Sequence, residues 1–371
     1  MIFAAAALVC AFSVPASAVE WNFYGSARVE TTWNSSDGGD TGSGDVEDSE
    51  LTWRDTTGSR IGARVKGENI SGLFEIKFLG GDNPSDTEIV SKHLYGEWDF
   101  GAGKFLVGKT YAGIQQFISA QMWAGDTGLL GLGAMYGGRP YQLALSFGGF
   151  RIALADPNSS LVSAVTFVEN GVTLGTIPGM TGGDVDEIFP KIEARYGMAF
   201  DQFSFNITGG YQHYEIEEVP SVVVPGTTND VDVDSWSVGA DAAVNFGPAY
   251  LKGCISFTRN GGNAGWTAAA GTWDGDDDID DADTLQGALV VGFKMSDQIT
   301  FEGGFGYRSD DYDVSGAKDD DTYTFYGNAT VALAPGVWVI PEIGYFDYDE
   351  NAAGTDEGDA WYAGAKWQID F

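Results

Sequence analysis

Trp361-Tyr362-Ala363-Gly364-Ala365-Lys366-Trp367-Gln368-Ile369-Asp370-Phe371 closes the chain, and this stretch decides the fold. In an extended strand, successive side chains point to opposite faces. One face is apolar and the other is polar: the first carries Trp361, Ala363, Ala365, Trp367, Ile369 and Phe371, and the second carries Tyr362, Lys366, Gln368 and Asp370. Chain ends fray unless something holds them. A terminal strand that is aromatic to its last residue therefore favours a closed membrane barrel, in which both of its edges are paired.

The same alternation recurs along the chain in about sixteen segments, an even number as bacterial barrels require. We expect strands to start near Trp21, Ser59, Leu73, Lys92, Gly103, Arg139, Phe150, Ile188, Phe203, Ser235, Ala249, Thr284, Gln298, Thr322, Val337 and Asp359. Aromatic residues cluster near the ends of these segments, which is typical of the two interfacial girdles of a membrane barrel.

Short and long connectors alternate between the segments. The short ones hold a few residues, such as Gly148-Gly149 and Pro335-Gly336. The long ones are acidic and cover about Asn34 to Gly58, Asp82 to Ser91, Asp156 to Glu187, Glu215 to Asp234, Asn260 to Asp283, Asp310 to Asp321 and Asp349 to Gly358. The predicted fold is all-β: a single transmembrane antiparallel β-barrel over residues 19–371, with short periplasmic turns and long acidic external loops.

Composition agrees with a barrel in the membrane. Glycine and aromatic residues are frequent, while the 371 residues include only 19 Lys and Arg. The mean hydropathy is slightly negative, but lumen-facing residues dilute the lipid-facing ones in such strands. The formal net charge of −35 excludes nucleic acid as a natural partner, because binding phosphates requires clustered Lys and Arg.

The first 18 residues form an uncharged apolar run that ends in Ala16-Ser17-Ala18. Small residues at these positions fit a signal-peptidase site, so we expect residues 1–18 to be a cleaved export signal. The absence of a basic residue before the run leaves the true start codon open. A single transmembrane helix is the alternative, although the run is short for a membrane span.

Basic side chains of the second strand are predicted to face the lumen. If Ile61, Ala63 and Val65 face lipid, then Arg60, Arg64 and Lys66 must face inward, since a charge on the lipid face costs roughly 2–4 kcal/mol near mid-membrane. The same argument turns Arg28, Glu30, Glu75 and Lys77 inward. In the alternative reading, these cations pair with wall carboxylates such as Glu30, Glu68 and Glu75.

Residues 111–131 differ from the other connectors because they carry a single acid, Asp126, together with Gln115 and Gln116. We expect this loop to fold into the barrel and narrow it, with Ile114, Phe117, Ile118, Met122 and Trp123 packed on the inner wall. A surface helix or an external lid is the alternative.

Asp274, Asp276 and Asp278 match the first, third and fifth positions of an EF-hand loop, but Ile279 stands where that loop needs glycine. We expect a solvated acidic loop and no cofactor, with loosely bound divalent cations as the alternative. The two histidines, His93 and His213, have no accompanying nucleophile or metal motif. We therefore do not expect an enzyme.

The chain resembles the general diffusion porins of Gram-negative bacteria, the sixteen-stranded trimeric family of the outer membrane. The likeness lies in Val19-Glu20-Trp21-Asn22-Phe23-Tyr24-Gly25, in Val107-Gly108-Lys109-Thr110-Tyr111, in Trp123-Ala124-Gly125-Asp126-Thr127 and in Trp367-Gln368-Ile369-Asp370-Phe371. The resemblance implies that Lys109 takes the place of a constriction Arg and that Trp367, Ile369 and Phe371 form the signal read by the barrel-assembly machinery. It also implies a homotrimer among outer-membrane lipid and lipopolysaccharide. The chain departs from the family at Met122, where members often carry a further acid.

The sequence thus predicts an outer-membrane porin that passes small hydrophilic solutes and ions by diffusion. Its eyelet would have a basic side of Arg28, Arg60, Arg64, Lys66 and Lys109, with Asp126 as the opposing or loop-anchoring acid. The alternatives are a channel specific for sugars or phosphate, which would have an aromatic track, and a non-conducting structural or adhesive barrel. A soluble secreted β-sandwich array is a more distant one.

Overall fold

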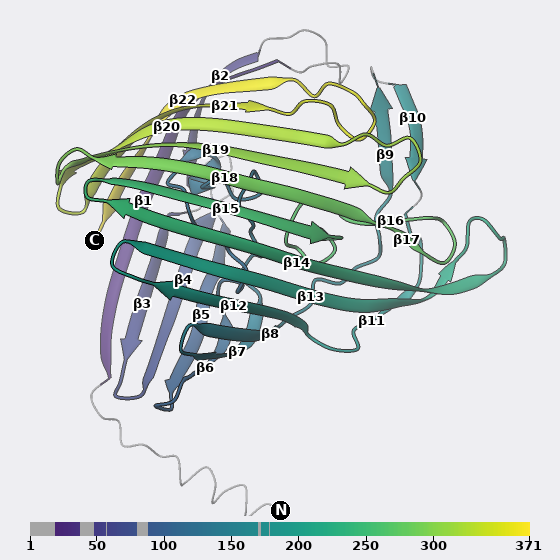
Figure 1. The fold of residues 1–371 in the computed structure, drawn as a ribbon, viewed down its shortest axis with the longest axis horizontal. Coiled ribbons are helices and arrows are strands. Elements are labelled where there is room, and N and C mark those ends of the chain that lie inside the picture. Colours follow the sequence, from purple (N-terminus) through teal and green to yellow (C-terminus); the bar gives the residue numbers. More distant parts are fainter. Residues whose placement is uncertain (1–18, 38–47, 57, 80–87, 170–171, 178) are drawn as a thin grey trace, which may run out of the picture.

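The computed structural model describes residues 19–37, 48–56, 58–79, 88–169, 172–177 and 179–371. Within them, sixteen antiparallel strands pair with their neighbours and close into one barrel (Figure 1). These strands are β1 (Glu20–Ser36), β3 (Arg60–Lys66), β4 (Ile70–Leu79), β5 (Glu88–Asp99), β6 (Lys104–Lys109), β7 (Tyr141–Phe147), β8 (Phe150–Ala155), β12 (Lys191–Ala199), β13 (Phe203–Pro220), β14 (Thr228–Phe246), β15 (Ala249–Arg259), β18 (Ala282–Lys294), β19 (Ile299–Tyr312), β20 (Asp320–Ala334), β21 (Val337–Asp347) and β22 (Asp359–Asp370). The predicted fold class is confirmed, and each predicted start lies in one of these strands or within three residues of it.

The terminal strand closes the barrel as predicted. β22 pairs with β1 from Ser26 opposite Asp370 to Ser36 opposite Ala360. Beyond the strand, Gly25 and Phe371 exchange two backbone hydrogen bonds of 2.7 and 3.0 Å. The side chains of Trp361, Trp367, Ile369 and Phe371 are exposed on the outer face, while Lys366 is buried on the inner one.

The outer face is apolar over a band that crosses the membrane. On β14, the exposed side chains Trp236, Val238 and Phe246 alternate with the buried Ser235 and Ser237. Aromatic side chains expected in the girdles are exposed at the strand ends, including Trp21, Phe23, Trp33, Trp98, Phe100, Phe200 and Phe203. Lipid would cover these rings, so their exposure carries no cost in the membrane.

Several strands continue into segments that the sequence analysis assigned to acidic loops. β13 and β14 pair as far as Pro220 opposite Thr228, inside the predicted loop Glu215 to Asp234. β1, β19 and β20 extend in the same way. The prediction was wrong there because acids with period two were read as loop charge, whereas the period itself indicates a strand.

The two faces of β13 and β14 exchange character at the level where Tyr211 pairs with Trp236. Nearer the short turns, apolar side chains point outward. Beyond this level, acids such as Asp232 are exposed on the outside, and Val231 and Val233 are buried on the inside. The inward residues form an external core of Val162, Met180, Tyr214, Ile216, Val219, Val231, Val233 and Trp273. The exchange marks the edge of the lipid band, because the extended strands stand in water.

Smaller elements complete the wall and the external side. β2 (Asp48–Asp55) pairs with β1, and β11 (Asp184–Asp186) pairs with β13. The hairpins β9–β10 (Val165–Glu169 and Val172–Ile177) and β16–β17 (Thr272–Trp273 and Ile279–Asp280) lie near the right-hand ends of β18–β20 in Figure 1, and β13 and β14 extend farther to the right. Among the described residues, the single helix is the four-residue turn α2 (Trp123–Asp126). No described helix has the length and apolar character to cross a membrane. The predicted export signal, residues 1–18, lies outside the described residues and stays a prediction.

Candidate functional site

Residues 110–140, between β6 and β7, lie inside the barrel as an inward loop. The loop leaves the wall near its middle, because Lys109, the last residue of β6, pairs with Leu94 about halfway along β5. Ile114, Ile118 and Met122 are buried, as expected for packing on the inner wall. The sequence analysis ended the loop at residue 131, whereas the wall resumes only with β7 at Tyr141.

Four glutamates of the wall hold the loop by accepting its backbone N–H groups. Glu193 of β12 accepts from Gly113 (2.6 Å), and Glu302 of β19 accepts from Ala120 (2.5 Å). Glu342 of β21 accepts from Met122 (2.8 Å) and Trp123 (3.2 Å), and Glu30 of β1 accepts from Gly125 (3.0 Å). All four glutamates are buried. These anchoring glutamates therefore do not expose charge to the channel.

The glutamines of the loop serve the same attachment. Gln116 donates to the backbone carbonyls of Ala240 and Ile255, at 3.1 Å each, and accepts from the N–H of Met135. Gln115 donates to the carbonyl of Gly138 within the loop. Both glutamines are buried, so they hold the loop in place and do not line the channel.

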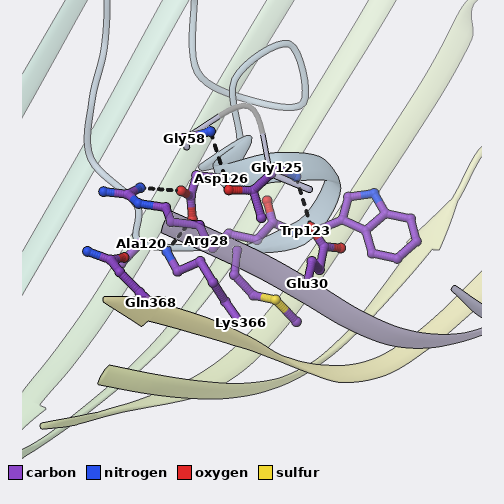
Figure 2. A network of polar contacts seen from close by, with 12 residues as sticks. Arg28, Glu30, Gly58, Ala120, Trp123, Gly125, Asp126, Lys366 and Gln368 are labelled. Atoms are coloured by element: carbon purple, nitrogen blue, oxygen red, sulfur yellow. Dashed lines mark hydrogen bonds and ion pairs between the residues drawn. The ribbon is translucent and has the colours of Figure 1, made fainter. Parts of the chain in front are cut away.

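The tip of the loop is fixed to β1 and β22 through Asp126 (Figure 2). Arg28 Nη1 lies 2.6 Å from Asp126 Oδ2, and Lys366 Nζ pairs with Asp126 Oδ1. Gly125, next to it, has a φ of 85°, a conformation that glycine adopts without the steric cost of a Cβ, and this turn aims its N–H at Glu30. Of the two roles predicted for Asp126, the geometry supports anchoring the loop.

The wall beside these anchors, where β3 pairs with β1, carries part of the predicted basic side. Arg60 lies opposite Lys77 in the β3–β4 register, and both face inward. The Arg64 guanidinium lies 5.0 Å from the centre of the Tyr24 ring. Arg60, Arg64 and Tyr24 line a hollow of about 380 Å³ in the lumen together with Tyr111, His93 and other residues.

The predicted pairing of these cations with wall carboxylates holds for one of the three acids. Glu75 contacts Lys92 at 2.9 Å and Arg60 at 3.6 Å, and it accepts a hydrogen bond from Tyr24 at 2.5 Å. Glu30 binds the loop instead, and Glu68 lies exposed in the β3–β4 turn. Lys92, buried in the bulge of β5, was not predicted.

Three further arginines face the lumen with neutral partners, and the sequence analysis assigned none of them to the site. Arg139 donates to the hydroxyls of Tyr136 and Tyr111, at 2.9 Å each. Arg151 donates to Gln142 Oε1, and Arg195 donates to Asn206 Oδ1. Within the described residues, none of these three nor Arg64 forms an ion pair with a carboxylate. The inward period of β8 and β12 could have identified Arg151 and Arg195, but nothing local distinguishes Arg139.

The two remaining predicted members of the basic side, Lys109 and Lys66, are the last residues of their strands. Lys109 pairs in register with Leu94 and Tyr141, whose side chains are exposed on the outer face. Its ammonium lies 5.7 Å from the centre of the Tyr141 ring. Lys66 lies at the end of β3 opposite Glu20, away from the loop. Gly108, directly before Lys109, has a φ of 131°, so the alternation of faces does not by itself place the Lys109 side chain, and the inward Lys77 lies within its electrostatic range. The assignment of Lys109 to the lumen stays a prediction.

The loop presents an apolar edge to the channel. Met122, at the place of the family's further acid, is fully buried, and Asp126, the single acid of residues 110–140, is engaged with two cations. Phe117 is 54% exposed, contrary to its predicted packing on the wall. Trp123 packs against Tyr362 and Phe346.

The acidic run at Asp274 forms the turn of the external β16–β17 hairpin. Asp274 Oδ1 accepts the N–H groups of Asp276 (2.8 Å) and Asp278 (3.2 Å). Among the described residues, no cluster of His, Cys, Asp or Glu is arranged to hold a metal ion. Loose binding of divalent cations by these acids stays a prediction.

Comparisons with known proteins agree with this geometry. The model of the Gram-negative porin family matches residues 4–351. No curated protein sequence matches the chain. The outer-membrane channel DcaP of Acinetobacter baumannii superposes with a TM-score of 0.68 at 14% identity, covering 95% of this chain and 97% of that one.

Two further solved structures share the fold at comparable identity. The anion-selective porin from Comamonas acidovorans has a TM-score of 0.59 at 12% identity, covering 95% of this chain and 100% of that one. Salmonella typhi OmpF in complex with daunomycin has a TM-score of 0.59 at 13% identity, covering 94% and 97%. Family and fold indicate a channel rather than an enzyme. The chain belongs to the Gram-negative porin family and forms a diffusion channel of the bacterial outer membrane.

Proposed function

We propose that small hydrophilic solutes and ions diffuse between the inward loop and the wall of β3–β8, and that this constriction prefers anions. One observation supports the preference for anions: the anchoring glutamates of the lumen are buried against the loop, but several of its arginines have no acidic partner among the described residues. The anchoring glutamates are buried beneath the loop, whereas Arg64, Arg139, Arg151 and Arg195 contact neutral groups. The water in the constriction is therefore exposed to a net positive wall, which attracts anions.

The external acids oppose this preference only weakly. The net charge of −35 lies largely in the external segments, yet acids of β14 such as Asp232 point outward from the extended wall. Exposed charges are screened beyond roughly 8 Å at physiological salt. Selectivity is consequently set where the channel is narrowest.

Reversal potentials in planar bilayers under a potassium chloride gradient test the proposal. We expect chloride to permeate better than potassium, and the double variant Arg64→Gln, Arg139→Gln to shift the reversal potential toward cation preference. Arg259→Gln is the matched control, because Arg259 points outward and pairs with Asp281 and Asp283. Cation selectivity that the double variant leaves unchanged would contradict the proposal.

We also propose a homotrimer that inserts through the barrel-assembly machinery among outer-membrane lipid and lipopolysaccharide. OmpT of Vibrio cholerae, with a TM-score of 0.56 at 14% identity, has been solved in a trimer form. Cyclic assembly of three identical barrels would produce equal conductance units. Closure of a single inserted particle in three equal steps is the expected recording, and one-step closure would contradict the trimer.

A further inference from the structure

Phe117 is the unusual residue of the inward loop. Its neighbours Gln116 and Ile118 are buried, but Phe117 is 54% exposed. It lies in the lumen and not in the lipid, because Gln116 attaches this part of the loop to the inner side of β14 and β15. An aromatic ring that faces the water of a channel has apolar surface available for a passing solute.

Phe117 belongs to a row of rings that leads to a cation. Its ring packs edge-on against Tyr111, with centroids 4.8 Å apart, and Tyr111 packs in the same way on His93, also at 4.8 Å. The Arg139 guanidinium lies 4.3 Å from the centre of the Tyr111 ring. Tyr111 thus contacts both the exposed ring and the guanidinium.

Arg139 is held in place without being neutralised. The hydroxyls of Tyr111 and Tyr136 accept its N–H groups, and a phenol leaves the positive charge uncompensated. Each hydroxyl also keeps its own proton, for which the described residues offer no acceptor. Lys77 lies within electrostatic range of Arg139 and adds a second cation.

The hollow beside this row is large enough for a small solute. It measures about 380 Å³, and its lining includes Tyr111, His93 and Arg64 together with the paired cluster of Arg60, Lys92 and Glu75, and Asp370. Arg60 and Arg64 continue the positive wall toward the periplasmic end of β3. An anion that leaves Arg139 therefore meets further cations along its path.

We propose that this part of the constriction selects aromatic carboxylates, and the proposal rests on the channel function proposed above. The ring of the solute lies against Phe117 and Tyr111, while its carboxylate accepts hydrogen bonds from Arg139 and the tyrosine hydroxyls. Inorganic phosphate would use the cations but not the exposed ring. A neutral sugar would use the rings but leave the guanidinium without an anion.

Bi-ionic reversal potentials with benzoate, cyclohexanecarboxylate and acetate against chloride test the selection. For the wild-type channel we expect the benzoate-to-acetate permeability ratio to exceed the ratio of their mobilities in water by about twofold or more, the size of one aromatic contact. Phe117→Ala should return the ratio to that of the mobilities. Arg139→Gln should lower the permeability of both anions.

Phe147→Ala is the matched control, because Phe147 is an exposed ring on the outer face of β7; it should leave every ratio unchanged. Phe117→Leu keeps an apolar side chain without the flat ring and separates stacking from general hydrophobicity. A wild-type ratio equal to that of the mobilities, or one that Phe117→Ala does not alter, would overturn the aromatic selection in a channel that still prefers chloride. A wild-type channel that does not prefer chloride to potassium would instead overturn the underlying proposal of an anion-preferring channel.

Discussion

Asp126 lies at the seam of the barrel, where the first strand pairs with the last. Its carboxylate lies between Arg28 of β1 and Lys366 of β22, and its side chain is 23% exposed. The two cations share this one acid, and among the described residues neither of them pairs with another carboxylate. The side chain therefore links the tip of the inward loop to the seam of the barrel.

Replacing Asp126 with Asn should loosen the tip. The two cations would face an uncharged amide, and we expect a loss of about 1–3 kcal/mol, less than for a fully buried pair because water reaches the site. A lower thermal unfolding temperature and noisier open-channel current would show this. Asp297→Asn removes the exposed partner of Lys294 in a turn and should change neither; equal effects from both variants would refute the anchoring role.

Asp280, in the external β16–β17 hairpin, predicts a pH dependence. Burial raises the pKa of its carboxyl, and the nearby Asp274 adds to the rise. An acid whose pKa is raised by folding binds more protons folded than unfolded, so the hairpin gains stability as the pH falls through the folded pKa and loses it on the return.

Amide hydrogen exchange of the hairpin should accordingly be slower at about pH 5 than at about pH 7.5, after correction for the intrinsic rates. Asp280→Asn should flatten this difference, whereas the exposed Asp277→Asn should keep it. Slower corrected exchange at the higher pH in the wild type would mean that the hairpin gains stability as the pH rises, which would contradict the interpretation.

At the scale of elements, β13 and β14 pass from the lipid of the membrane into the water outside it. Below the Tyr211–Trp236 pair the apolar face meets lipid, and beyond it the apolar face meets the external core. Val233 is fully buried on the inner side and Asp232 is exposed on the outer side. The side chains alternate between the two faces along the whole pair of strands. Only the side that is apolar changes, from the outer face to the inner face.

Val233→Asp should therefore damage the external core and leave the channel intact. A carboxylate buried there without a partner costs about 3 kcal/mol or more, and limited proteolysis should cut the external segments sooner. Val223→Asp places the same side chain at an exposed position and should have no effect. Changed conductance in Val233→Asp with unchanged proteolysis would contradict the separation of core and channel.

Periodicity predicts the strands well but not what the inward loop contacts. The alternation of β14 and β22 fixed their faces, and the low charge of residues 111–131 indicated that the loop lies inside. The partners of the loop come from distant segments: Ala120 meets Glu302, and Met122 meets Glu342. No local pattern encodes such pairs, and for the same reason Arg139 was missed.

At the scale of the whole molecule, Phe371 completes the closed ring of strands. Its backbone exchanges two hydrogen bonds with Gly25, and its ring lies against Gly25, where even a Cβ would come within 2.4 Å of it. The residue thus joins the two ends of a described chain that runs from Val19. Its side chain remains exposed on the outer face, where another protein can contact it.

Deleting Phe371 should reduce the amount of protein in the outer membrane much more than the conductance of each inserted channel, because its side chain is exposed on the outer face and takes no part in the constriction. Quantitative blotting of outer-membrane fractions and single-channel recording measure the two quantities separately. Phe200→Ala, at an exposed girdle position, is the control. Normal membrane levels of the truncated protein would refute the role of Phe371 in assembly.

The anchoring glutamates have a consequence for how such channels diverge. They recognise backbone N–H groups of the inward loop, which every amino acid except proline supplies. Mutations can therefore exchange the side chains that the loop shows to passing solutes while its attachment to the wall persists. The solute selectivity of such a channel can therefore change through substitutions at positions such as Phe117 and Ala120. The same positions can be altered by design without changing the barrel.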